Sequence, residues 1–535
     1  MTFLKRFALT LLCITASMLT ALLLTSCTDN YEGGVLYDGL TVTDVDEDAE
    51  SVTVKDGTTA IAAGAFKDCK RLTSVNLPDS ISEIAPGAFD GCDALIKSED
   101  GVLYVDNWAI GASEGTTEIT IKDGTRGIAR EAFINMSSLK SVSVPSSVKH
   151  IGARAFFRCS SLEKITLPFI GKSSTTKNST HLGYIFGAFN KEQNSDYVPE
   201  SLKEVHITNA DEISDYAFSN CEKIVTVTLP KSVKSIGAQA FSECTALSSI
   251  DIPDSVSSIG DKAFYKCSAL TSVRLPENAD FTLIPEYTFA YCSSIRELTI
   301  PKSVKEIGAC AIARCINLES IKFENELTER IGQQAFDGCK YLTSINLGAK
   351  KIEKAAFQNC IGLADVTLSE GSVEIEGYAF NGCSGITSFN MPKSVTKIGE
   401  FAFYACHSLT SITLGEGITK IEASTFQNCI NLKGTVIPKS VMSVGENAFF
   451  GCNALITRRD GISFVDGWIT EIQPSVTALE IGDEVVGFAD GVFDDAANLS
   501  EITFTGAVES WEIIKKTVPA SVISSVKIAI SSNKS

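Results

Sequence analysis

The pattern Phe-x-x-Cys recurs through most of this 535-residue chain at intervals close to 23 residues, as in Phe241/Cys244 and Phe264/Cys267. A fixed period of roughly 20–50 residues predicts repeated units that stack as a solenoid, because one unit cannot bury its own apolar side chains. Complete copies begin at Phe66, Phe89, Phe156, Phe218, Phe241, Phe264, Phe289, Phe336, Phe357, Phe380, Phe403, Phe426 and Phe449. Repetition therefore constrains the fold more than composition does.

The rest of each unit repeats as well. After Cys244, apolar residues fall at Leu247, Ile250 and Ile252, and Pro253 follows. Alternation at the end of this segment predicts a short strand, which the proline ends because it cannot donate a ladder hydrogen bond. Residues 259–264 are too short for an ordinary helix, so we expect a tight turn or a single helical turn there. We predict a repeat solenoid of about 16 or 17 coils of about 23 residues.

The strand pattern Leu-x-x-Ile-x-Ile-Pro-x-Ser-Val (247–256) resembles the leucine-rich repeat. Together with Ile-Gly-x-x-Ala-Phe-x-x-Cys (259–267), it is similar to the BspA-like leucine-rich repeat family of bacterial cell-surface lipoproteins. The resemblance covers roughly residues 56–504 and implies a right-handed β-solenoid-like array with short strands and tight turns. It also implies an interaction role, since some family members bind extracellular-matrix proteins.

The N-terminus has the features of an export signal. Lys5 and Arg6 precede an apolar run over 7–24, and Leu24-Thr25-Ser26-Cys27 resembles a bacterial lipobox. We expect residues 1–26 to be a lipoprotein signal peptide and Cys27 to be lipidated, with a retained membrane helix as the alternative. By analogy with lipoproteins, Thr28 indicates sorting to the bacterial outer membrane, where we expect the protein at the cell surface; whether it faces outward stays open.

The remaining boundaries follow from where the repeat begins and ends. We expect an anchor and linker over 27–50, the leucine-rich repeat solenoid over 51–505 and a C-terminal cap over 506–535. Three segments of equal span, 33–66, 100–133 and 460–493, share a second pattern, which places hairpin-like inserts near 96–118 and 456–478. Trp108 and Trp468 occupy the same slot in two of them. Either these hairpins grip a ligand with exposed aromatic side chains, or they cover the apolar stack; we favour the covering role.

A long loop over 169–200 interrupts the period. Tyr184, Phe186, Phe189 and Tyr197 lie beside a polar run over 172–180, and long loops on solenoids often sit on a binding face. The alternative is that Phe186 or Phe189 is another core residue. On the strands, outward positions are mostly Ser and Thr, but charged residues replace them at Arg296, Glu297 and Lys322. These are candidate binding residues on a flat β-surface that suits an extended partner.

Seventeen cysteines in an exported chain would ordinarily suggest a disulfide framework. Fourteen of them, however, share one position of the repeat and so form a single ladder. We predict free, buried thiols there, with Cys310 outside the ladder and partly exposed. Four scattered histidines argue against a metal site. The net charge of −19 disfavours nucleic acid and anionic membranes and favours partners with basic patches, leaving the lipid anchor as the contact with a membrane.

No nucleophile elbow, zinc-protease or phosphate-loop motif occurs, so we expect no catalytic residues and no cofactor. The prediction is a surface-anchored protein-binding module, an adhesin or interaction protein whose ligand is a host extracellular-matrix or bacterial surface protein. The alternative is an envelope scaffold or a glycan-capture lipoprotein.

Overall fold

The computed structural model describes residues 31–531, which form two compact units, 31–160 with 185–187, and 161–184 with 188–531. The expected signal peptide over 1–26 and the lipidation site Cys27 lie outside the described residues. No helix within 31–531 is long and apolar enough to cross a membrane.

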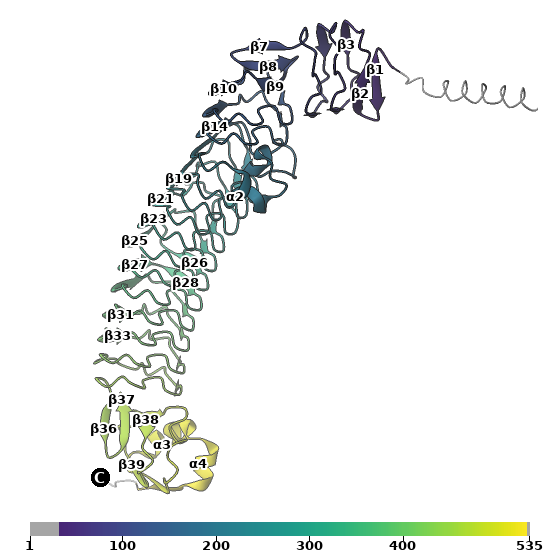
Figure 1. Ribbon diagram of the computed structural model, residues 1–535. Helices are drawn as coiled ribbons and strands as arrows, with labels where there is room; N and C mark the ends of the chain where they lie inside the picture. Colours follow the sequence, from purple (N-terminus) through teal and green to yellow (C-terminus); the bar gives the residue numbers. More distant parts are fainter. Residues whose placement is uncertain (1–30, 532–535) are drawn as a thin grey trace, which may run out of the picture. The chain divides into compact units, whose positions relative to one another are not determined.

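Each coil contributes two strands to two separate parallel ladders. In Figure 1 the strands β19, β21, β23, β25 and β27 follow one another on one face, and β26 and β28 lie on the opposite side of the same coils. The first set, which we call the strand face, corresponds to the predicted Leu-x-x-Ile-x-Ile strand. The second strand, such as Ser258–Ile259, lies where only a turn was expected. The array has about 21 turns, more than the 16 or 17 expected.

The strand face of the first unit contains β3 (Ser51–Thr53), β5 (Ser74–Asn76), β10 (Glu118–Thr120) and β12 (Ser141–Ser143). Its opposite ladder contains β4 (Ala60–Ile61), β6 (Glu83–Ile84), β11 (Gly127–Ile128) and β13 (His150–Ile151). Both ladders pair in register, so that Val52 lies opposite Val75 and Ile61 opposite Ile84.

The strand face of the second unit contains β14 (Lys164–Leu167), β15 (Glu204–Ile207), β17 (Thr226–Thr228), β19 (Ser249–Asp251), β21 (Ser272–Arg274), β23 (Glu297–Ile300), β25 (Ser320–Phe323), β27 (Ser344–Leu347), β29 (Asp365–Leu368), β31 (Ser388–Asn390), β33 (Ser411–Thr413), β39 (Ala478–Ile481) and β41 (Glu501–Phe504). The opposite ladder contains β16 (Glu212–Ile213), β18 (Ser235–Ile236), β20 (Ser258–Ile259), β22 (Leu283–Ile284), β24 (Glu306–Ile307), β26 (Thr328–Ile331), β28 (Ala349–Ile352), β30 (Glu374–Ile375), β32 (Lys397–Ile398), β34 (Lys420–Ile421), β35 (Ser443–Val444) and β40 (Gly487–Phe488).

The core is a set of side-chain columns. The rings of Phe241 and Phe264 are stacked with centroids 5.2 Å apart, and those of Phe357 and Phe380 are 5.3 Å apart. All four rings are fully buried. Since the spacing of stacked rings is close to that of adjacent strands, roughly 4.8 Å, one ring per coil fills the column.

A column of thiols runs beside the phenylalanines. All fifteen described cysteines are free and buried, which confirms the prediction for the ladder. Each ladder thiol from Cys92 onward donates a hydrogen bond, except Cys221, to a main-chain carbonyl of the preceding coil. The bond from Cys267 to the Phe241 oxygen is 3.1 Å long, and that from Cys383 to Phe357 is 3.0 Å. Burial raises the pKa of Cys267 well above its usual range, which keeps the donor protonated.

Glycines let neighbouring coils approach closely. A Cβ on Gly260 would lie 2.3 Å from the main-chain nitrogen of Ala238 in the preceding coil. The turn around Phe241 instead uses a left-handed backbone at Gln239 and Glu243, with φ of 54° and 61°. Gly260 therefore serves the close approach of coils and not the turn conformation that we expected of it.

Three β-hairpins interrupt the coils. They are formed by β1 (Val35–Asp38) with β2 (Thr41–Val45), by β7 (Lys97–Glu99), β8 (Val102–Val105) and β9 (Trp108–Ala112), and by β36 (Thr457–Arg459), β37 (Ile462–Val465) and β38 (Trp468–Ile472). Asp106 accepts a hydrogen bond from the Leu77 main-chain nitrogen at 3.1 Å, and Asp466 accepts one from Ile437 at 2.6 Å. The turns of the second and third hairpins therefore each accept a hydrogen bond from the backbone of an earlier coil.

Helical segments occur at two places. The long loop holds η1 (Leu182–Phe186), η2 (Lys191–Gln193) and α2 (Asn194–Tyr197), and the C-terminal region holds α3 (Val508–Ile514), η3 (Lys515–Thr517) and α4 (Ala520–Ser525). Trp511 and Ile514 of α3 are buried against the last coils, where the rings of Trp511 and Phe504 are 5.6 Å apart. The final strand β42 (Lys527–Ile530) adds to β41 in parallel.

Candidate functional site

The strand-face ladder is broken between β21 and β23. β21 ends one sheet and β23 begins another, so the two neighbouring strands are not hydrogen-bonded as a pair. The coil between them is longer than its neighbours, because Phe264 and Phe289 are 25 residues apart and the preceding pair only 23. The extra residues lie after β21, where Phe281 is buried and its nitrogen bonds to the Asn278 oxygen at 3.0 Å.

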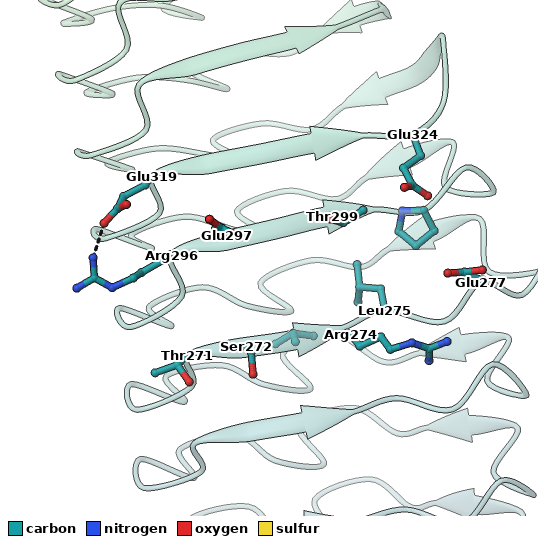
Figure 2. Close-up of a pocket in the computed structure, with 12 residues that line it drawn as sticks. Thr271, Ser272, Arg274, Leu275, Glu277, Arg296, Glu297, Thr299, Glu319 and Glu324 are labelled. Carbon is teal, nitrogen blue, oxygen red and sulfur yellow. Dashed lines mark hydrogen bonds and ion pairs between the residues drawn. The ribbon is translucent and has the colours of Figure 1, made fainter.

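A groove of about 570 Å³ lies at this break (Figure 2). Its lining residues come from β21 and β23 and from the residues that flank β21, β23 and β25: Thr271, Ser272, Val273, Arg274, Leu275, Glu277, Arg296, Glu297, Thr299, Pro301, Glu319 and Glu324. Figure 2 shows Arg296 and Glu319 at the end where the strands begin, with Arg274, Glu277 and Glu324 at the other end. The groove is open and shallow, which suits an extended chain better than a small enclosed molecule.

Arg274 connects this groove to a second one of about 560 Å³, which β17 and β19 line. Its guanidinium donates two 2.8 Å hydrogen bonds to the carboxylate of Asp254 and one of 3.4 Å to Asp251. The bond from Arg274 lowers the pKa of Asp254, which therefore stays ionised at neutral pH. The Arg274 side chain is therefore fixed by the carboxylates of Asp251 and Asp254 on the same strand face.

The three charged candidates on the strand face lie on adjacent strands. Arg296 forms an ion pair with Glu319, Lys322 forms one with Glu324 at 2.9 Å, and Glu297 projects into the groove between them. Of the acidic side chains described in the groove, Glu277 and Glu297 have no ion pair. Sequence reasoning missed Glu277 and Glu324, although the two extra residues after β21 were a visible signal.

The four aromatic candidates of the long loop differ in how deeply they are buried. Phe186 is fully buried with its ring 6.4 Å from that of Phe156, so it is a core residue and cannot contact a ligand. Phe189 is 86% exposed. Tyr184 and Tyr197 are half-buried. The four side chains do not form the surface cluster that we expected, because the 3-10 turn of η1 directs Phe186 inward.

A buried asparagine holds the second half of this loop. The Asn194 side-chain oxygen accepts hydrogen bonds from the Gly183 nitrogen at 2.9 Å, and lies 3.1 Å from His181 Nδ1. The amide of Asn194 donates to the Ser219 carbonyl at 2.8 Å. Burial lowers the pKa of His181, which favours its neutral form. The loop is therefore a packed element after residue 181.

Trp108 and Trp468, the candidate binding residues of the hairpins, do not form an exposed aromatic platform. Trp108 is 1% exposed and Trp468 is 2% exposed. Each indole lies against a glycine of the next coil, since a Cβ on Gly127 or Gly487 would fall within 2.7 Å of the ring. The hairpin strands therefore direct both rings into the core, in agreement with the covering role that we favoured.

The described residues hold no cluster of three or more metal-ligating side chains. Cys310, which we expected to be partly exposed, is buried against Ala290 and Ala313 beside Tyr265 and Tyr287. Its left-handed backbone, with φ of 53°, turns the thiol under these rings. Burial raises its pKa, so its reactivity as a thiolate is low at neutral pH.

Comparison with known families decides the classification. The model of the BspA type leucine-rich repeat region matches residues 46–163, 104–181, 211–343 and 329–456. The chain belongs to this family. BspA-type proteins are typically found at the cell surface, and their leucine-rich repeats generally mediate protein interactions on a scaffold that is typically non-catalytic.

Solved structures with similar folds come from several bacteria. A leucine-rich repeat protein from Bacteroides ovatus is 24% identical, with 81% of this chain and 96% of that chain covered and a TM-score of 0.43. A leucine-rich cell surface protein from Faecalibacterium prausnitzii is 22% identical, with 78% and 97% covered and a TM-score of 0.31. The pneumococcal vaccine antigen PcpA is 16% identical, with 94% and 96% covered and a TM-score of 0.24. No curated protein matches the BspA-type chain.

Proposed function

We propose that this protein is a surface-anchored protein-binding module that acts as an adhesin or interaction protein. The observation that supports this proposal is the groove at the break between β21 and β23, where polar side chains and two carboxylates with no ion pair among residues 31–531 face outward on a strand surface. Such a surface offers many hydrogen-bonding groups to an extended polypeptide. We take the ligand to be a host extracellular-matrix protein or another bacterial surface protein.

The anchor belongs to the same proposal. A lipid on Cys27 would hold the array at the bacterial outer membrane, with the residues before β1 as the tether to the folded chain. The boundaries 51–505 and 506–535 are part of this assignment. The linker expected over 27–50 is too long, because β1 and β2 within it form a hairpin whose Val35 and Val42 are buried. Radiolabelled palmitate incorporation that is lost in Cys27→Ala would support the anchor, and equal incorporation in both would contradict it.

An inward-facing envelope scaffold is the second candidate. The acidic chain and its regular coils suit that role as well, and protease shaving of intact cells separates the two, since an outward-facing array is digested and an inward-facing one is protected. Glycan capture loses its main support, because Trp108 and Trp468 are buried and offer no exposed platform.

A pull-down tests the binding surface. Thr299 on β23 and Thr413 on β33 occupy equivalent exposed positions of the strand face, but only Thr299 lines the groove. Full-length protein bearing Thr299→Tyr should lose the envelope or matrix protein that the wild type retains, and Thr413→Tyr should retain it. Equal retention by both variants would contradict a role for the groove.

A further inference from the structure

Three consecutive coils carry an exposed apolar side chain in the turn after the ladder cysteine. Ile316, Tyr341 and Ile361 are 38%, 61% and 48% exposed. In earlier coils of the same unit this turn holds Glu222, Thr245 and Ser268. We call Ile316, Tyr341 and Ile361 the edge stripe, and contiguous exposed apolar residues of this kind often mark interaction sites.

The turns that carry the edge stripe stack on one another. The Tyr341 nitrogen bonds to the Ile316 oxygen at 3.2 Å, and the Gly362 nitrogen bonds to the Lys340 oxygen at 2.9 Å, so the three turns stack directly. At a strand spacing of roughly 4.8 Å, the stripe extends over about 10 Å. Ile316 lies three residues before Glu319, which pairs with Arg296 at the near end of the groove.

The charge of the grooves indicates which partner fits. Six carboxylates line them, namely Asp251, Asp254, Glu277, Glu297, Glu319 and Glu324, against three lining cations, Lys231, Arg274 and Arg296. Lys322, which does not line the grooves, also pairs with Glu324. Glu277 and Glu297 are exposed and lack ion pairs among the described residues. The excess negative charge repels acidic segments and nucleic acid, and the net charge of −19 opposes docking of a second copy.

We propose that the partner segment is an extended, cationic polypeptide whose basic side chains meet Glu277 and Glu297 and whose apolar side chains pack on the edge stripe. This inference rests on the proposed function and specifies its partner. The groove lies in the coils of β21, β23 and β25 and the edge stripe in the coils of β25, β27 and β29, so a segment that runs across these coils meets the carboxylates and the apolar residues in turn. Basic side chains would then face the groove while apolar ones face the stripe.

Fluorescence anisotropy with three labelled peptides of about twelve residues tests the chemistry. The probes alternate Lys with Val, Lys with Ser, and Glu with Val, and the protein is the full-length chain. The Lys–Val peptide should bind about tenfold more tightly than the other two, and less tightly at high salt. Equal binding of the Lys–Val and Lys–Ser peptides, or of the Lys–Val and Glu–Val peptides, would overturn the proposal.

Variants then locate the site. Tyr341→Ser and the double variant Glu277→Gln/Glu297→Gln should each weaken Lys–Val binding about tenfold. Ile430→Ser removes an apolar residue that is 45% exposed from the corresponding turn of a coil outside the edge stripe and should have no effect. All these residues are at the surface, so thermal unfolding should not change. Equal weakening by Ile430→Ser would overturn the assignment. If Thr299→Tyr abolishes the pull-down while the peptides show no preference, the partner chemistry is wrong but the proposed function stands.

Discussion

The thiol of Cys292 donates a 3.1 Å hydrogen bond to the main-chain oxygen of Phe264, 28 residues earlier in the chain. Equivalent bonds join Cys315 to Phe289 and Cys452 to Phe426, each between neighbouring coils. The Phe264 oxygen also accepts a 3.2 Å hydrogen bond from the Cys267 nitrogen, so the thiol is its second donor and is supplied without the strong desolvation cost of a hydroxyl. This relationship explains why the repeat uses cysteine at a position that alanine or valine would fit by size alone.

Replacing one ladder cysteine by alanine should therefore lower the free energy of unfolding by more than the loss of side-chain volume alone would. Cys292→Ala leaves the Phe264 oxygen without its thiol donor and opens a small cavity, so we expect the free energy of unfolding to fall by about 1–3 kcal/mol. Guanidinium unfolding followed by circular dichroism measures this. Cys310→Ala, outside the ladder, is the control and should cost less. Equal losses for the two variants would show that the bond contributes nothing specific.

Two glycines form a matched pair for the close packing of coils. A Cβ on Gly260 would meet the Ala238 nitrogen at 2.3 Å, whereas a Cβ on Gly434 meets nothing within 4 Å. Gly260→Ala should lower the free energy of unfolding by at least about 2 kcal/mol, since main chain must shift. Gly434→Ala should be neutral or slightly stabilising. Similar melting temperatures for the two variants would contradict the packing that we describe.

Alkaline pH should destabilise the array. Burial raises the pKa of Cys221, Cys244 and Cys315 well above the ordinary value of 9.0. Stability from these groups is fully present below pH 9 and is lost as pH rises, because the unfolded chain then releases protons that the native chain retains. Each such thiol contributes a slope of about 1.4 kcal/mol per pH unit. Thermal unfolding from pH 7 to pH 10 measures the loss, which should become shallower as ladder cysteines are replaced by alanine. An unchanged slope would contradict the assignment to thiols.

The three tryptophans should behave as core residues. Trp108, Trp468 and Trp511 are all buried. Native protein should therefore show blue-shifted tryptophan fluorescence that iodide hardly quenches, and unfolding should restore quenching to the level of free tryptophan. Strong quenching in the native state would contradict their burial and would support the alternative, in which an exposed aromatic hairpin binds a ligand.

Periodicity was sufficient to predict the columns. The positions of Phe264 and Cys267 recur in every regular coil, so their burial follows from stacking identical units. The second strand of each coil, Ser258–Ile259, was missed because two residues carry no readable alternation. The left-handed backbone at Gln239 was also missed, since glycine marks the same position in only some coils, such as Gly87.

The candidate site was only partly predictable. Arg296 and Glu297 were noted because charge replaces Ser and Thr at outward positions, but the groove beside them depends on a break in pairing that a single sequence does not show. Phe186 and Phe189 were indistinguishable in sequence, and a local 3-10 turn places one inside and the other outside. Trp468 left two alternatives open, because an aromatic residue in a hairpin suits both a surface platform and a core cover; its burial agrees with the cover that we favoured.

Site-specific photo-crosslinking tests most directly whether the groove between β21 and β25 is where a partner docks. A photoreactive phenylalanine analogue placed at Thr271, an exposed residue that lines the end of the groove, should capture the protein that the wild type retains in a pull-down. The same analogue at Phe189 on the long loop, or at Thr413 on β33, should capture little of it. Capture from position 189 or 413 with none from 271 would contradict the account.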